Sequence, residues 1–290
     1  MERLNNRRVS GQKPKHQLNL TSQTVGLATA GIRRERWLAE AQDADSRGSK
    51  RPVANELLAG LPADMFKRLR PYLKEMVLEK DEYLYQQDDH IDSVYFPDSA
   101  VISEFQILED GRTIEVAITG PEGAVGVTSA FSVCTATSCT QICVPGTVWK
   151  IKSDVLEREI AADRELNRLL HAQINANIRQ LSQKIICNTY HSLEQRFCTW
   201  LLAMTERCGT NKLQVTQEHV ARVLGVHRPS VTYIAQALRD LKLIDYRRGR
   251  IIVSNREGLK DHACPCYSDN GAAVSTPMVV SASWPSAVKH

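Results

Sequence analysis

The 290-residue chain lacks the features that mark membrane and secreted proteins. No apolar run approaches the roughly eighteen residues that a membrane-spanning helix needs. The arginines near the N-terminus (Arg3, Arg7 and Arg8) are not followed by an apolar block with a small-residue cleavage site, which argues against a secretory signal. Hydrophobic residues make up 42% and charged residues 24% of the chain, as in soluble globular proteins. We therefore expect a cytoplasmic protein.

Cysteine is present but is poorly spaced for metal binding. No cysteine precedes Cys134, and only Cys264 and Cys266 are close together. No second pair lies at the spacing of a zinc site, so the sequence predicts unpaired thiols, several of them buried, with no metal site and no cofactor.

The apolar pattern divides the chain into segments. Residues 1–52 are polar and irregular, and residues 268–290 are rich in Ser, Ala, Gly and Pro. We expect a flexible extension, or an over-long start of the reading frame, and a disordered tail. Residues 53–153 start with a short helical pattern broken by Pro62 and Pro71, and continue as short apolar runs between turn signals. Many short strands at this spacing predict a small antiparallel roll.

Residues 154–190 have the period of a long helix. Asp163 can cap it near its start, and one apolar seam runs along it: Leu166, Leu170, Ile174, Ile178, Leu181 and Ile185. A small roll cannot bury all of such a seam, so we predict that it pairs with the same helix of a second copy. The alternative is a helix that packs only within its own subunit.

Residues 191–267 predict a winged helix-turn-helix. A helix from about Ser192 to Arg207 is stopped by Gly209. Thr216 can then cap a helix that Gly225 ends, and Pro229 suits the first turn of the next helix.

The spacing of small and β-branched residues makes this pattern more specific. Ala221 lets the two helices cross closely, and Val231 fills their shared core. The alternative is an ordinary helical hairpin.

The second of these helices carries polar residues suited to DNA. Arg228 lies at the end that enters the major groove, where its guanidinium can bond both acceptors of a guanine. Residues 243–253 predict two strands joined by a basic turn, a wing whose arginines contact phosphates. From Lys212 to Arg256 the chain has nine basic and three acidic residues, which favours double-stranded DNA as partner. The predicted DNA-binding residues are His227, Arg228, Ser230, Thr232, Tyr233, Gln236, Arg247, Arg248 and Arg250.

The order of these parts resembles the Crp/Fnr superfamily of bacterial transcription regulators over residues 53–267. The segments 94–99, 109–112, 120–126 and 224–232 carry the resemblance. It implies an α+β fold: an N-terminal cyclic-nucleotide-binding-like antiparallel β-roll, a long dimerisation helix and a C-terminal winged helix-turn-helix. It also implies a homodimer on a pseudo-palindromic operator, with RNA polymerase as a further partner.

The phosphate-binding segment departs from the family pattern. Gly126 is followed by Val127 where nucleotide-binding members have a glutamate, and residues 132–140 contain no arginine. A cyclic phosphate needs such a partner, so we expect an effector other than cyclic AMP. A cyclic-nucleotide-responsive member with an atypical pocket is the alternative. The candidate effector pocket, whose backbone amides can hold an anion, comprises Glu122, Gly123, Val125, Gly126 and Val127.

The cysteines and histidines of this chain also do not match the cofactor-binding members of this family. The iron–sulfur members use cysteines near the N-terminus, which this chain lacks, and His171 or His191 alone is weak evidence for haem. The ending Cys264-Pro265-Cys266-Tyr267 resembles that of a subgroup without the nucleotide contacts. It is either a redox handle or a terminal packing motif.

Two other functions are less compatible with the sequence. A metal-dependent cupin-type enzyme needs two or three histidines and a carboxylate inside the roll, but His90, in a polar turn, is the roll's single histidine. We therefore expect no enzyme. A helix-turn-helix that binds another protein is disfavoured by the basic wing.

Overall fold

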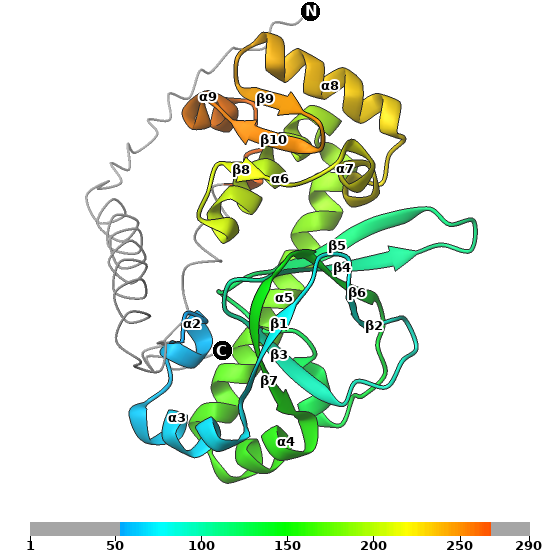
Figure 1. Ribbon diagram of the computed structural model, residues 1–290. Helices are drawn as coiled ribbons and strands as arrows, with labels where there is room; N and C mark the ends of the chain where they lie inside the picture. The colour runs from blue at the N-terminus through cyan, green and yellow to red at the C-terminus, as the bar shows by residue number, and fades with distance from the viewer. Residues whose placement is uncertain (1–52, 268–290) are drawn as a thin grey trace, which may run out of the picture. The chain divides into compact units, whose positions relative to one another are not determined.

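The computed structural model describes residues 53–267 (Figure 1). The expected N-terminal extension (1–52) and C-terminal tail (268–290) lie outside the described residues. Within the described part of the chain, no helix combines the length and the hydrophobicity that crossing a bilayer requires.

Short helical elements precede the roll: α2 (Glu56–Ala59), α3 (Ala63–Leu69) and the 3₁₀ helix η1 (Arg70–Tyr72). Asn55 caps α2 by accepting the amide hydrogen of Leu58, and its own side-chain amide donates to the carbonyls of Pro97 and Gly123. Because this asparagine is fully buried, its hydrogen bonds fix the leading helices to two turns of the roll.

Two antiparallel sheets form the roll, with strand orders β1-β7-β3 and β2-β6-β4-β5 (Figure 1). Their strands are β1 (Lys74–Leu78), β2 (Tyr83–Tyr85), β3 (Ser93–Pro97), β4 (Val101–Ile107), β5 (Thr113–Thr119), β6 (Cys139–Val144) and β7 (Gly146–Lys152). The 3₁₀ helix η2 (Val127–Phe131) lies between β5 and β6. The predicted roll is confirmed. The sequence did not separate β1 from the helical pattern before it, because β1 is an edge strand whose only buried residue is Leu78.

The helical stretch after the roll is divided at Asp163 into α4 (Ser153–Ala162) and α5 (Arg164–Tyr190). Asp163 has an extended backbone, and its carboxylate accepts the amide hydrogens of Glu165 and Leu166. The predicted cap is therefore confirmed. It splits the segment 154–190 in two, because an N-cap residue leaves the helical conformation.

The winged helix follows α5 without a linker. Its elements are α6 (Leu193–Cys208), β8 (Lys212–Leu213), α7 (Gln217–Leu224), α8 (Arg228–Asp240), β9 (Ile244–Arg247), β10 (Arg250–Val253) and α9 (Arg256–Asp261). Ser192 and Gln195 form a capping box at the start of α6, and Gly209 ends the helix with a φ of 62°. Both boundaries follow the sequence prediction.

The roll and the winged helix share one hydrophobic core. Val101, Phe105 and Ile118 of the roll cluster with buried residues of α6, α7 and α8. A second core joins η2, α4 and the start of α5. The helix-turn-helix is thus packed directly on the roll.

Candidate nucleic-acid interface

The helix-turn-helix is built by the local signals that predicted it. Thr216 accepts the amide hydrogen of His219 to cap α7, and Gly225 ends α7 in the left-handed region with a φ of 64°. Pro229 lies in the first turn of α8, where its missing amide hydrogen costs no helix bond. Ala221 and Val231 are buried where the helices cross, so the predicted motif is confirmed.

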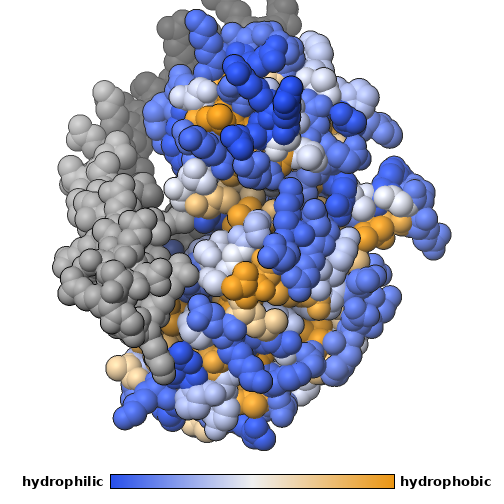
Figure 2. Space-filling view, viewed as in Figure 1, coloured by the Kyte–Doolittle hydropathy of each residue, from blue (hydrophilic) through white to orange (hydrophobic). Residues whose placement is uncertain are grey.

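The predicted contact residues of α8 and its N-cap are all exposed. His227, Arg228 and Ser230 lie at the N-terminal end, and Tyr233 is 79% exposed one turn further on. Figure 2 shows that hydrophilic side chains predominate over α8, β9 and β10, in the upper part of the view.

Some of these side chains are held in place within the motif. The Thr232 hydroxyl donates to the side-chain oxygen of Gln217 at 2.8 Å, and the Gln236 amide donates to Asp240 at 2.7 Å. Arg228 forms no ion pair with any residue between 53 and 267. Its guanidinium is therefore available to a base, whereas Thr232 ties α8 to α7.

The wing is a hairpin with a two-residue turn, Arg248-Gly249. Both residues have positive φ, 44° and 77°, as a type I′ turn requires, and this turn type matches the twist of the flanking strands. Glycine adopts a positive φ without steric penalty, which suits Gly249 to its position. The turn projects Arg247, Arg248 and Arg250, all exposed, and Arg247 lies 3.2 Å from the carboxylate of Asp245.

Charge on this domain is divided between the surface and the interior. Arg222 donates to Gln141 of β6 at 3.2 Å and lies 4.9 Å from the centroid of the Phe105 ring, and Arg256 pairs with Glu206. The other seven of the nine basic residues from Lys212 to Arg256 are exposed. The basic surplus predicted from the sequence is therefore divided, since two arginines make contacts within the fold and the other seven basic residues remain at the surface.

His219 of α7 does not add to this charge. Its ring packs edge-on against Phe105 at 6.3 Å and lies 6.2 Å from Trp200. Burial lowers the pKa of His219 below its usual value. The histidine is thus a neutral core residue between the roll and the helix-turn-helix.

In the turn predicted to bind an effector (residues 122–127, the candidate effector turn), most polar groups already bond to other groups of the protein. The Glu122 carboxylate accepts from the guanidinium of Arg207 on α6 at 2.7 Å; Arg207 is buried and Glu122 is partly buried. The amide of Val125 donates to Tyr95, and that of Gly123 donates to Gly120. The expectation that these amides can hold an anion is wrong for Gly123 and Val125, because both already have acceptors.

The remaining pocket residues are also turned inward. Val125 and Val127 are core side chains. Gly126 has a φ of 80°, and a β-carbon there would lie 2.8 Å from the carbonyl oxygen of Ser93, so glycine is needed for backbone contact. Glu122 and Gly123 line a cavity of about 140 Å³ between the roll, α5 and α6. The open space therefore lies beside the turn, not within it.

Comparisons with known proteins agree with this architecture. A model of the cyclic nucleotide-binding domain matches residues 75–163, and a model of the Crp-like helix-turn-helix domain matches residues 195–262. The chain belongs to the Crp/Fnr superfamily of transcription regulators.

Solved structures show the same Crp/Fnr fold. FixK2 from Bradyrhizobium japonicum is 20% identical with a TM-score of 0.59, over 66% of this chain and 98% of that one. A putative regulator of the Crp/Fnr family from Eubacterium rectale is 17% identical with a TM-score of 0.59, over 71% and 98%. The c-di-GMP-responsive regulator CLP from Xanthomonas campestris is 14% identical with a TM-score of 0.53, over 66% and 99%. No curated protein matches the sequence.

The apolar seam that was predicted to pair two copies is divided along α5. Leu166 and Leu170 are 2% and 3% exposed and lie in the subunit's own core, with Ile174 packed against it. These three residues were predicted to face a second copy. The prediction is wrong for the two leucines, because η2 and α4 already cover them. Exposed apolar side chains begin further along, at Ile178, Leu181 and Ile185.

The sequence did not predict one cluster of possible metal ligands. Cys187 and His191, at the end of α5, lie beside Cys264 and Cys266. The expectation of no metal site rested on cysteine spacing alone and took no account of histidine. The i, i+4 spacing of Cys187 and His191 places both on one helix face, and this was the available signal.

Proposed function

We propose that this Crp/Fnr regulator binds a pseudo-palindromic operator as a homodimer, acts in the cytoplasm through RNA polymerase, and has no catalytic activity. The recognition face of α8 carries the proposal. It combines an unpaired arginine at the helix N-terminus, exposed polar side chains behind it and a basic wing beside it. Arginine at this place reads guanine in the major groove, while the wing supplies salt-sensitive affinity.

The exposed half of α5 supports the homodimer. Ile178, Leu181 and Ile185 follow at spacings of three and four residues, which is the repeat of a two-stranded coiled coil. Two copies joined along these residues would present two α8 helices related by a two-fold axis. Half-sites about one helical turn apart follow from that symmetry.

The closed turn supports an effector other than cyclic AMP. A cyclic phosphate requires a cation or several free donors, and residues 132–140 supply no arginine. The guanidinium of Arg207 reaches this turn, but it is already paired with Glu122. A cyclic nucleotide would have to break this ion pair before it could use the charge of Arg207.

Binding to selected DNA tests the proposal. An operator is first selected from a random duplex pool with the full-length protein. Arg228→Ala is then expected to raise the Kd for that operator at least about thirtyfold, since each half-site loses roughly 1–3 kcal/mol. Affinity for random DNA and the mass of the dimer should not change. Addition of cyclic AMP should leave the wild-type Kd unchanged.

Arg158→Ala is the matched control, because Arg158 is an exposed arginine on α4, in the part of the chain before α5. It should bind the operator like the wild type at the same salt concentration. Equal Kd values for Arg228→Ala and Arg158→Ala would refute the reading role of α8. Tighter operator binding with cyclic AMP would refute the statement about the effector.

A further inference from the structure

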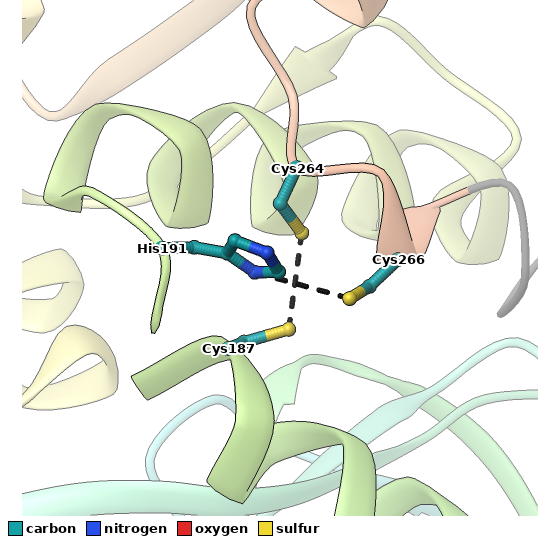
Figure 3. Close-up of side chains that lie close together, drawn as sticks. All are labelled: Cys187, His191, Cys264 and Cys266. Atoms are coloured by element: carbon teal, nitrogen blue, oxygen red, sulfur yellow. Dashed lines mark hydrogen bonds between the residues drawn. The ribbon is translucent and has the colours of Figure 1, made fainter. Parts of the chain in front are cut away.

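Four side chains with metal-binding atoms converge where α5 ends (Figure 3). Cys187 and His191 come from the last turns of α5 and its C-cap, and Cys264 and Cys266 from the segment after α9. Their ligand atoms all lie within 4.8 Å of one another, and within residues 53–267 this is the one group of its kind. Two chain segments more than seventy residues apart thus lie together at these cysteine sulfur atoms and the His191 imidazole.

Two of the distances between these atoms are those of neighbouring ligands around one tetrahedral ion. The sulfur atoms of Cys187 and Cys264 are 3.8 Å apart, and the sulfur of Cys266 is 3.8 Å from Nδ1 of His191. Zinc bonds of about 2.3 Å to sulfur and about 2.0–2.1 Å to nitrogen separate tetrahedral ligands by roughly 3.5–3.8 Å. A disulfide would instead need the sulfurs at about 2.05 Å.

The surroundings suit thiolate ligands. The three cysteines are buried and form a cluster of their own. Thr199 accepts the amide hydrogen of Cys264 at 3.0 Å, so its own hydroxyl hydrogen is free to point at the Cys264 sulfur, 3.1 Å away. The side-chain amide of Gln183 donates to the sulfur of Cys187 at 3.8 Å. Donors of this kind orient and stabilise metal-bound thiolates.

We propose that Cys187, His191, Cys264 and Cys266 form a closed site for one zinc ion. Three sulfurs and one imidazole nitrogen are the donors that zinc prefers in structural sites, and four protein ligands leave no open position for catalysis. The ion ties the end of α5 to the C-terminal segment of the winged helix. It thereby fixes the junction between α5 and α6. This structural role is independent of the DNA sequence that the protein binds.

Metal analysis of the full-length protein, purified without chelators and without a histidine tag, tests the site. Elemental mass spectrometry should find one zinc ion per chain. The double variant Cys264→Ser/Cys266→Ser should contain only background zinc. Cys134→Ser, in a half-buried cysteine of the roll, is the matched control and should keep the full zinc content.

Two further measurements apply even where the double variant does not fold. His191→Cys replaces the imidazole with a fourth thiolate and should retain zinc, whereas His191→Ala should lose it on brief dialysis against a chelator. Cobalt added to chelator-treated wild type should give the intense visible absorption of a tetrahedral thiolate site. Wild-type protein that holds no zinc and gives no such absorption would overturn the proposal, as would a Cys187–Cys264 disulfide in a non-reducing peptide map.

Discussion

The two halves of α5 follow the same apolar period but have different partners. In the first half, Leu166 and Leu170 are buried against η2 and α4 of their own subunit. In the second half, Ile178 is 54% and Ile185 67% exposed, although both continue the same seam. What holds the second half to the roll is polar, because Gln180 pairs with both backbone groups of Ile118.

This difference shows that periodicity identifies the apolar face of a helix but not what covers it. The first half lies where η2 and α4 supply apolar cover. The second half passes an edge strand, β5, whose free backbone groups select polar partners on the near face and leave the apolar face outward. An exposed apolar stripe on an otherwise well-packed helix requires cover in solution.

The largest expected effect comes from charging the exposed half. Ile178→Asp/Ile185→Asp would place two carboxylates from each copy in the centre of the predicted coiled coil. Burying unpaired charge costs several kcal/mol per ion, so the dimer dissociation constant should rise more than about a thousandfold. Sedimentation equilibrium measures this directly, and circular dichroism should show an unchanged helix content.

Val133→Asp is the control for this substitution. Val133 is an apolar residue of the roll with 57% exposure, close to that of Ile178, but it lies outside α5. Its variant should remain as dimeric as the wild type. A wild-type protein that is monomeric at micromolar concentration would contradict the dimer, and with it the division of α5 between two partners.

The buried half should respond to cavity formation. Leu170→Ala removes a side chain that is 3% exposed, so the free energy of unfolding should fall by about 2–5 kcal/mol. Leu181→Ala, the same change at 40% exposure, should cost less than about 1 kcal/mol when both are measured in the monomeric Asp background. Urea unfolding followed by tryptophan fluorescence gives both values. Equal losses in the free energy of unfolding would mean that Leu170 and Leu181 are equally buried within one copy, contrary to the division of α5.

The helix-turn-helix could be predicted because its signals are local. Thr216, Gly225 and Pro229 each fix a helix boundary through the backbone of their immediate neighbours, and the structure uses all three as predicted. The same holds for the cap at Asp163 and for Gly209, which ends the helix predicted from about Ser192. These residues need no partner from elsewhere in the chain.

Contacts between distant residues could not be predicted in this way. Glu122 and Arg207 are 85 positions apart, and Cys187 and Cys264 are 77 apart. The sequence showed that residues 132–140 lack an arginine, but not that an arginine of α6 reaches the effector turn. Spacing rules detect metal sites whose ligands share a loop, and here the ligands come from two segments that only the fold brings together.

The polar attachment of the second half of α5 to the roll gives the smallest expected effect. Lys184 donates to the buried carboxylate of Glu115 at 3.0 Å, and the Ser103 hydroxyl donates to the other oxygen at 2.8 Å. Lys184→Met would leave that carboxylate with Ser103 alone. Because Lys184 is itself 26% exposed, water can partly replace it, and we expect a loss of about 1–3 kcal/mol in the free energy of unfolding.

Lys67→Met, which removes an exposed lysine on α3, should have almost no effect. Lys184→Met/Glu115→Gln should recover part of the stability, because it removes the unpaired charge as well as its partner. A Lys184→Met protein as stable as the Lys67→Met protein would show that Glu115 does not need the lysine. In that case Gln180 alone would join this half of α5 to the roll by side-chain hydrogen bonds, and the apolar seam behind it would be the stronger constraint on where the helix lies.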